Sequence, residues 1–333
     1  MSRRLFLVLL LQVAVTFSTF AGGQSEGQMA PAQADLEEET YAMVVFLKGS
    51  EFFNWCYAGM RDAAKAIGPH VKVELQGPAE WDATLEARAV DQLVARQVDG
   101  ILVTAGDAAT LVPSINRAID RDIPVVTFDS DAPDSNRLAF VGTNNYAAGY
   151  RAGETMVEWL DGEGHIGVST FPGPDHLRQR VDGFRTAIED AGADIEVSVV
   201  NDEGDVAKAE TQLTALLQAN PDINGIFGAH GNPGPGAASA VNTLNMGDQV
   251  DIMAFDFGMP VIELIEKGEI RGTVGQNPYL MGYMAMLLAY SANHPTEVMS
   301  AKAPFGHVPD NVDTGVSILG VEEVQMYKNP PTF

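Results

Sequence analysis

Two aspartates, each preceded by a phenylalanine, are the side chains of this 333-residue sequence best suited to contact a ligand: Phe128-Asp129 and Phe255-Asp256. Each pair ends a short apolar run that contains β-branched residues, a pattern typical of a buried strand. A carboxylate at a strand end can accept hydrogen bonds from a ligand, or it can cap the segment that follows. Because the pair occurs twice, we favour ligand contact.

The segment that leads to Asp129 has the pattern of a βαβ unit. Residues 101–104 and 123–128 are apolar runs, and between them apolar residues recur at helical spacing behind Asp107, a possible N-cap. A right-handed crossover makes the two strands parallel, so we expect Thr104 and Asp129 at the sheet edge where open α/β folds bind ligands. Residues 223–256 repeat this pattern, which indicates two similar lobes whose acidic edges form a cleft.

The elements that must position these residues alternate between strand and helix patterns from Tyr41 to Ala292. This alternation predicts an α/β fold with two Rossmann-like lobes, each a parallel sheet covered by helices. We expect the chain to cross between the lobes near Asn144, near Gln276 and before Val316, which makes a three-crossing hinge. The expected organisation is a signal peptide at 1–22, a disordered leader at 23–40, an N-terminal lobe at 41–143 plus 277–305, a C-terminal lobe at 144–276 plus 306–325, and a tail at 326–333.

The first residues have the pattern of an export signal. Arg3 and Arg4 precede an apolar stretch at 5–17 that is too short to span a membrane, and small residues follow. No cysteine lies near the cleavage region, so a lipid anchor is not expected. We therefore predict a periplasmic or secreted protein.

Composition excludes several classes of partner and cofactor. The formal net charge of −25 argues against nucleic-acid binding, which requires a basic surface. Cys56 is the only cysteine, which excludes an internal disulfide and a thiolate cluster for a metal. We expect no cofactor, no metal, and a monomer with one ligand per chain.

Several motifs, taken in order, resemble the ribose-binding-protein type of periplasmic sugar-binding protein (periplasmic binding protein type I). They span nearly the whole sequence after the signal region and comprise Phe52-Phe53, Val98-Asp99-Gly100-Ile101, the run at 123–129, Val141-Gly142-Thr143-Asn144, Arg178-x-Arg180-x-x-Gly183-Phe184 and Phe255-Asp256. The resemblance implies two lobes that close on one sugar or polyol, which is delivered to the permease of an ABC importer.

The resemblance also implies roles for individual side chains. Phe52 and Phe53 would lie against the faces of the sugar, and His230 stands where ribose binders have an Asn. Gly204 stands where they have an aromatic residue. Thr104, Asp129, Arg178, Asp256 and Gln276 would bind the hydroxyls.

For four residues near the start and for two later ones, the pattern leaves alternatives open. Phe53 lies on the apolar stripe of its helix and could belong to the core, whereas Phe52 and Trp55 lie off that stripe. Lys48 precedes the Phe pair and is a further candidate. Arg178 could be a solvated helix charge, and His230 could be structural.

The sequence favours a binding protein over an enzyme. It contains no Gly-x-Ser-x-Gly, no Gly-x-Gly-x-x-Gly after a strand and no His pair at metal-ligand spacing. A transcription regulator would need a basic DNA-binding segment where the signal peptide lies. An autoinducer-2-type receptor remains an alternative, because Lys48, Gly77-Pro78 and Asp129-Ser130-Asp131 resemble that type. A sugar sensor that feeds a chemoreceptor is a further alternative.

Overall fold

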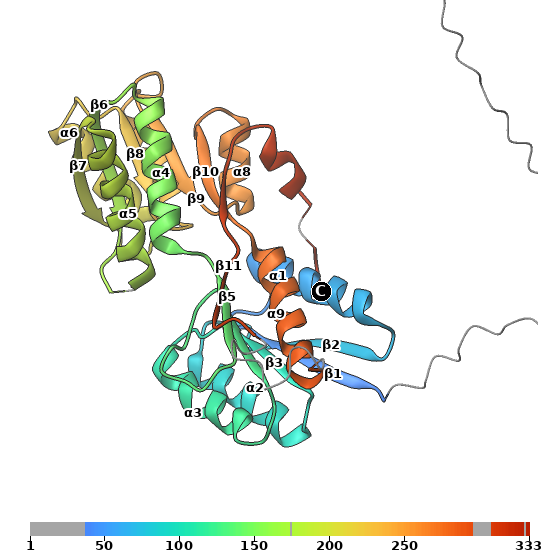
Figure 1. Ribbon diagram of the computed structural model, residues 1–333. Coiled ribbons are helices and arrows are strands. Elements are labelled where there is room, and N and C mark those ends of the chain that lie inside the picture. The colour runs from blue at the N-terminus through green and yellow to red at the C-terminus, as the bar shows by residue number, and fades with distance from the viewer. Residues whose placement is uncertain (1–36, 174, 296–307, 330) are drawn as a thin grey trace, which may run out of the picture. The chain divides into compact units, whose positions relative to one another are not determined.

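The computed structural model describes residues 37–173, 175–295, 308–329 and 331–333, of which residues 38–333 belong to one compact unit. This unit contains two six-stranded sheets with the same central strand order, β5-β4-β3-β1-β2 and β10-β9-β8-β6-β7. That order is one of the common doubly wound arrangements. The predicted fold of two α/β lobes is therefore confirmed (Figure 1). The predicted signal peptide at 1–22 lies outside the described residues.

The first sheet is built from strands that are parallel throughout. Helices α1 and α9 cover one face of this sheet, and α2 and α3 cover the other (Figure 1). Side chains alternate along β1, so that Tyr41 and Met43 pack beneath the first pair and Ala42 and Val44 against the second. The elements are β1 (Glu39–Val44), α1 (Glu51–Ile67), β2 (Val71–Gln76), α2 (Ala83–Arg96), β3 (Gly100–Val103), α3 (Ala108–Ile119), β4 (Val125–Phe128), β5 (Ala139–Gly142), α9 (Pro278–Asn293) and β11 (Asn311–Asp313).

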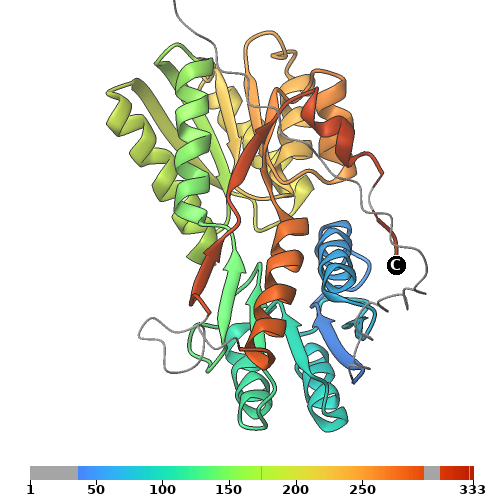
Figure 2. The same cartoon turned by 45° about the vertical axis from the view of Figure 1, so that its right-hand side comes forward.

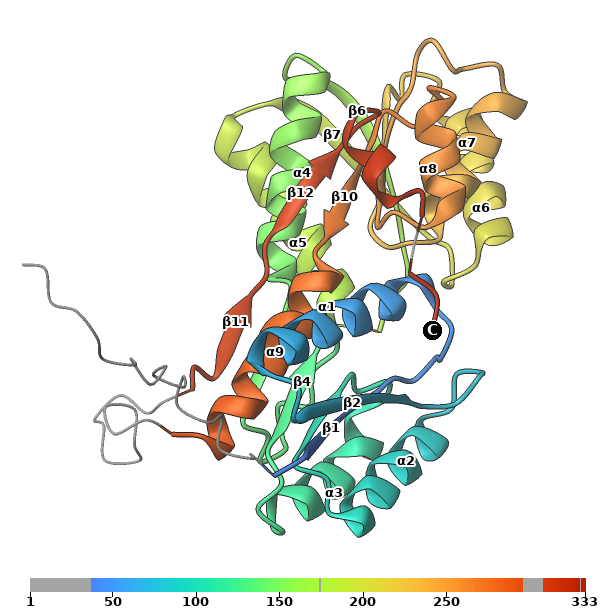
Figure 3. The same ribbon diagram turned by 90° about the vertical axis from the view of Figure 1, so that its right-hand side faces the viewer.

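The second sheet also has helices on both faces: α4 and α5 cover one, and α6, α7 and α8 cover the other (Figure 3). Its elements are α4 (Asn145–Trp159), β6 (Glu163–Thr170), α5 (Asp175–Ala191), β7 (Asp194–Asn201), α6 (Val206–Ala219), β8 (Gly225–Gly228), α7 (Pro233–Thr243), β9 (Asp251–Phe255), α8 (Met259–Glu266), β10 (Gly272–Gln276), β12 (Val316–Leu319) and the 3-10 helix η1 (Glu323–Tyr327).

Local sequence explains where helix α3 begins. Asp107 accepts a hydrogen bond from the Thr110 amide at 2.8 Å, which confirms it as the N-cap of α3.

Close contacts between helices depend on glycine. A Cβ on Gly59 would lie 1.9 Å from the carbonyl oxygen of Tyr279, where α1 crosses α9. Gly149 allows the same close approach between α4 and α5, where a Cβ would lie 1.8 Å from the carbonyl oxygen of Arg180.

The structure corrects three expected boundaries. β11 pairs with β5 (Figure 2), so the last change of lobe comes after Asp313 and not at 305 to 306. The expected leader at 23–40 overlaps β1, which already begins at Glu39, and the expected tail begins inside η1. β12 runs antiparallel to β10, because β10 ends where the chain leaves the second lobe and β12 begins where the chain returns to it. The second sheet is therefore mostly, and not wholly, parallel.

Candidate functional site

The two Phe-Asp pairs occupy equivalent places at the ends of β4 and β9. Both phenylalanines are fully buried, and both aspartates have left-handed backbone conformations, with φ of 60° at Asp129 and 62° at Asp256. The Asp129 amide donates to the carbonyl of Val141 on the neighbouring strand, and the Asp256 amide donates to that of Val274. Left-handed backbone is unfavourable for residues other than glycine and recurs at functional sites. The sequence repeat therefore corresponds to one turn built twice.

Hydrogen bonds hold the Asp129 carboxylate in the first lobe. Its Oδ2 accepts from the Thr104 hydroxyl at 3.2 Å and from the Ser130 hydroxyl at 3.4 Å. Thr104 is fully buried at the end of β3. The predicted meeting of Thr104 and Asp129 at one sheet edge is thus present, and it follows from the parallel pairing of β3 and β4.

The Asp256 carboxylate is held where the chain passes between the two sheets. Its Oδ1 accepts from the Gln276 side-chain amide at 2.9 Å, and the oxygen of that amide accepts from the Thr143 hydroxyl at 2.7 Å. Thr143 follows β5 of the first sheet, whereas Gln276 ends β10 of the second. The amide therefore connects a carboxylate of one lobe to a strand exit of the other.

Arg180 lies close enough to both carboxylates for the charges to act on one another. It is only 5% exposed, its Nε donates to Asn145 Oδ1 at 2.9 Å, and its guanidinium carbon lies 3.7 Å from the ring centroid of Phe255. One Nη donates to the carbonyl oxygen of Ala229 at 3.0 Å. Stacking on an aromatic face and fixed hydrogen bonds hold a guanidinium in one orientation. Sequence reasoning named Arg178 in its place, although Arg180 stands in the same quoted motif.

The charges of this group act on one another. Burial raises the pKa of Asp129 to about 6, the Asp256 carboxylate adds to that rise, and the Arg180 guanidinium opposes it. Burial also raises the pKa of Asp256, again opposed by Arg180. Burial lowers the pKa of Arg180 to about 10 in spite of both carboxylates. The site thus concentrates two acceptors and one strong donor in a poorly hydrated place.

A second hydrogen-bonded group lies at the ends of β6, β7 and β8. Asp202 is fully buried, and both of its carboxylate oxygens lie 3.0 Å from His230 Nε2. The Ser169 hydroxyl donates to Asp202 Oδ2 at 2.7 Å. His230 borders the first group, because a Cβ on the adjacent Gly231 would lie 3.4 Å from Asp256 Oδ2.

An aromatic side chain accompanies His230. The Phe171 ring packs edge-on against the His230 ring with centroids 5.2 Å apart. The same ring lies over Gly204, where a Cβ would approach it to 3.3 Å. The space that an aromatic residue at 204 would take is therefore filled by Phe171, which comes from the loop after β6.

A cavity of about 800 Å³ is lined in part by Asp129 and lies within the size range of small-molecule sites. The first lobe contributes the loops that follow β3, β4 and β5, including Asp129 and Thr143. Asp175, His176 and Gln179 contribute from the start of α5. Polar residues of the first lobe and of helix α5 thus line one cavity.

A model of the periplasmic binding protein domain matches residues 41–293. The chain belongs to the periplasmic binding protein family. The D-ribose/D-allose-binding protein of Pseudomonas aeruginosa is 26% identical over 96% of this chain and 98% of its own length. AraP, an arabinose-binding protein from Geobacillus stearothermophilus, superposes with a TM-score of 0.84 at 31% identity, covering 88% of this chain and 100% of that one. A sugar-binding protein of a sugar ABC transporter from Bacillus halodurans superposes with a TM-score of 0.81 at 35% identity, covering 87% and 100%.

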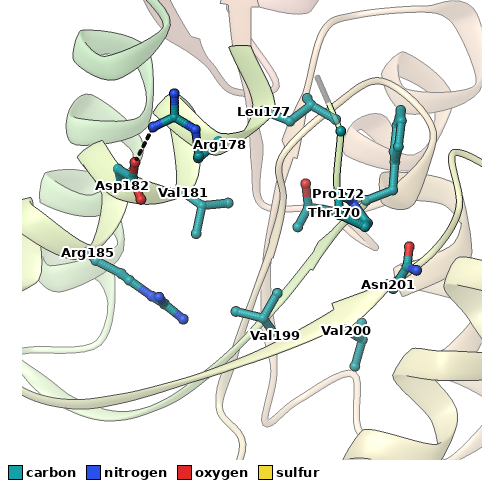
Figure 4. A pocket seen from close by; sticks show the side chains of 12 residues that line it. Thr170, Pro172, Leu177, Arg178, Val181, Asp182, Arg185, Val199, Val200 and Asn201 are labelled. Atoms are coloured by element: carbon teal, nitrogen blue, oxygen red, sulfur yellow. Dashed lines mark hydrogen bonds and ion pairs between the residues drawn. The ribbon is translucent and has the colours of Figure 1, made fainter. Parts of the chain in front are cut away.

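In this periplasmic binding protein, Arg178 lies outside the aspartate group. Its side chain is 63% exposed and pairs with Asp175 at 3.0 Å and Asp182 at 3.3 Å. Figure 4 shows it at a separate cavity of about 480 Å³ between α5 and β7, with Val181 and Val199. The reason is helical phase: each residue turns a helix by about 100°, so Arg178 and Arg180 lie on nearly opposite faces of α5.

The remaining predicted residues lie around α1. Phe53 is 4% exposed and packs against Phe46, Phe52 and Phe128, so it belongs to the core. Phe52 is half-buried beside it. Trp55 packs against Tyr327 and the core of the second lobe. Lys48 is exposed in the loop before α1, and its amide donates to the carbonyl of Pro78 at 2.7 Å.

Within the described residues, no helix has both the length and the hydropathy that a membrane crossing requires. His, Cys, Asp and Glu side chains of the same residues do not gather in groups of three or more that could hold a metal ion.

Proposed function

We propose that this protein captures one monosaccharide or polyol in a cleft between its lobes and delivers it to an ABC importer. The observation that carries the proposal is Arg180, a buried cation placed among Asp129, Asp256 and the aromatic face of Phe255. Asp129 follows a strand of the first lobe and Asp256 follows a strand of the second, whereas Arg180 lies on helix α5 of the second lobe.

The chemistry of this group suits a polyhydroxylated ligand. Each sugar hydroxyl both donates and accepts, so carboxylates and a guanidinium can bind it through charge-assisted hydrogen bonds, which are stronger than neutral ones. The apolar C–H faces of a sugar pack on aromatic rings. Phe52, half-buried at the start of α1, is the side chain that we propose for that contact.

The names of the relatives support the same class of ligand. One relative is named for D-ribose and D-allose and another for arabinose, so pentoses and hexoses are both represented. All are named as binding proteins, which supports a role without catalysis. We propose a location outside the cytoplasm on the same grounds, with the signal peptide predicted at 1–22.

Thermal-shift measurements over pentoses, hexoses, polyols and autoinducer-2, followed by calorimetry, test the proposal. We expect one site per chain for a monosaccharide or polyol. Arg180→Ala should weaken binding by about 100-fold, or about 3 kcal/mol, because it leaves buried acceptors without a donor. Arg178→Ala removes the same charge from the same helix and should bind normally.

Three results would contradict the proposal: no sugar or polyol that binds, turnover of the bound sugar, or equal losses in the two variants. Tight binding of autoinducer-2 alone would favour the alternative of a signal receptor.

A further inference from the structure

The carboxylate of Asp202 is hydrogen-bonded to two side chains that are distant in the sequence as well as to a nearby backbone amide. Besides His230 Nε2 and the Ser169 hydroxyl, its Oδ1 accepts from the amide of Gly204 at 2.8 Å. The side chain is fully buried and follows β7, the edge strand of the second sheet. Burial acts to raise the pKa of Asp202, but the bonds from His230, Ser169 and Gly204 outweigh it, so the pKa lies below its ordinary value.

This arrangement decides which nitrogen of His230 carries the proton. An ionised carboxylate has only acceptors, so Nε2, at 3.0 Å from both Asp202 oxygens, must donate. In a neutral imidazole the other nitrogen, Nδ1, is then an acceptor. Histidine fixed in this way differs from an amide, which can turn to offer either a donor or an acceptor.

The Nδ1 atom has only a weak partner within the part of the chain that the structure describes. The Asn232 amide donates to it at 3.4 Å, which is long for a hydrogen bond. The His230 side chain is 11% exposed, and the neighbouring Gly231 adjoins Asp256. Nδ1 can therefore accept from a ligand hydroxyl a shorter hydrogen bond than the one that it receives from Asn232.

We propose that Asp202 is a positioning residue: it holds His230 in the Nε2–H tautomer, so that the site offers Nδ1 to a ligand hydroxyl that must donate. This proposal rests on the proposed sugar binding and specifies one contact of that site. It implies that the site selects a ligand with a free donating hydroxyl at this position. A deoxy or O-methyl derivative at that carbon would be rejected.

Nitrogen NMR of protein labelled with ¹⁵N-histidine tests the tautomer without any ligand. At pH 8, where an ordinary imidazole is neutral, the six histidines can be compared with those of His230→Gln to assign His230. We expect a protonated Nε2 and an unprotonated Nδ1 in the wild type, and a mixture of tautomers in Asp202→Asn. A protonated Nδ1 in the wild type would overturn the proposal.

Calorimetry with D-ribose, D-allose and D-arabinose as probes then connects the tautomer to binding. Asp202→Asn should weaken binding of the best probe at least 10-fold. Adding His230→Gln to Asp202→Asn should weaken that binding little further. If Asp202→Asn keeps its tautomer and its affinity, or only lowers the unfolding temperature, Asp202 is structural and the proposal fails. If Asp202→Asn does not fold, the wild-type spectrum with and without the probe decides the question. The ¹⁵N chemical shift of His230 Nδ1 must then change when the probe binds.

The two proposals fail separately. If none of the three probes binds the wild type while other sugars do, the spectrum is repeated with the sugar that binds. If nothing binds, the proposed function falls, whereas the tautomer of His230 is still read from the free protein.

Discussion

At the scale of single residues, Asp129 combines a left-handed backbone with a pKa that burial raises to about 6. An unfavourable backbone conformation and a perturbed pKa both recur at functional sites, which is why we propose Asp129 as a ligand contact. The same turn at Asp256 supports this interpretation.

Sugar binding should depend on pH through Asp129. Because its pKa is about 6, the carboxylate is ionised at pH 7.5 and mostly protonated at pH 5, where it loses its charge-assisted bonds. If binding needs the ionised form, affinity falls about 10-fold between these values. Calorimetry at several pH values checks this, with Asp129→Asn as the control. That variant should bind weakly and with a flatter profile, and an unchanged slope would assign the titration to another group.

Glu86 is a further buried carboxyl, outside the aspartate group. It lies on α2 with no exposed surface, Oε2 accepts from the Gly106 amide at 3.1 Å, and Oε1 has no hydrogen-bond partner within the described residues. Burial raises the pKa of Glu86 to about 8, opposed by that amide. Gly106 lines the cavity of about 800 Å³, so Glu86 is hydrogen-bonded to a backbone segment of the cavity wall.

A carboxyl whose pKa is raised by folding favours the folded state in acid. Its contribution is complete below the unfolded pKa near 4.5 and is lost as the pH rises through about 8. Glu86→Gln cannot ionise, so at pH 8.5 it should be more stable than the wild type by roughly 2 to 4 kcal/mol, and the difference should shrink towards pH 5. Urea unfolding at both pH values measures this. The exposed Glu80→Gln should show no such trend, and a constant difference for Glu86→Gln would refute the assignment.

At the scale of elements, the contact between α4 and α5 positions Arg180. Gly149 on α4 faces the backbone of Arg180, and Gly183 on α5 faces the carbonyl oxygen of Tyr146, where a Cβ would lie 2.1 Å away. The two helices therefore touch through their backbones. This contact fixes which face of α5 turns towards the aspartates.

Gly149→Ala should therefore impair binding as well as stability. The new methyl group would lie 1.8 Å from the Arg180 carbonyl oxygen and must push the helices apart. We expect a loss of about 1 to 3 kcal/mol in unfolding free energy, typical of overpacking, together with weaker sugar binding. Gly247→Ala, which meets no atom within 4 Å, is the matched control. A destabilised variant with normal affinity would show that this contact does not position Arg180.

At the scale of the whole molecule, three segments connect the two sheets. The chain leaves the first after β5, returns to it through α9, which packs on β3, β4 and β5, and leaves again between β11 and β12. Several connections between two lobes permit hinge closure and restrict twisting. Asp129 lies on the first lobe and Arg180 and Asp256 on the second, so a sugar that contacts all three favours the form in which they are close.

Ligand should therefore shift the protein towards a closed form. Small-angle scattering should give a smaller radius of gyration with a saturating sugar than without it. Arg180→Ala at the same sugar concentration should retain the larger radius, since it loses a contact of the second lobe. An unchanged wild-type radius, with binding confirmed by calorimetry, would argue against closure as the response.

The sequence by itself determined the features that depend on local pattern. Apolar periodicity predicted the alternating strands and helices, and the repeated Phe-Asp pair predicted two equivalent strand ends, because parallel strands bring their carboxyl ends to one edge. Asp129, Thr104, Asp256 and Gln276 could therefore be chosen as site candidates without coordinates. Their hydrogen bonds to one another follow from the register of β3 with β4 and of β9 with β10.

Only the tertiary structure decided the features that depend on contacts between distant segments. Arg178 and Arg180 are equally plausible in sequence, and the packing of α5 on α4 selects Arg180 by turning its face inwards. Asp202 and His230 are separated by a helix and a strand, so no local pattern pairs them. Phe171 fills the space over Gly204, and β11 joins the first sheet through pairing with a strand about 170 residues earlier. In each case the outcome depends on which distant segments come into contact, and the local sequence does not specify that contact.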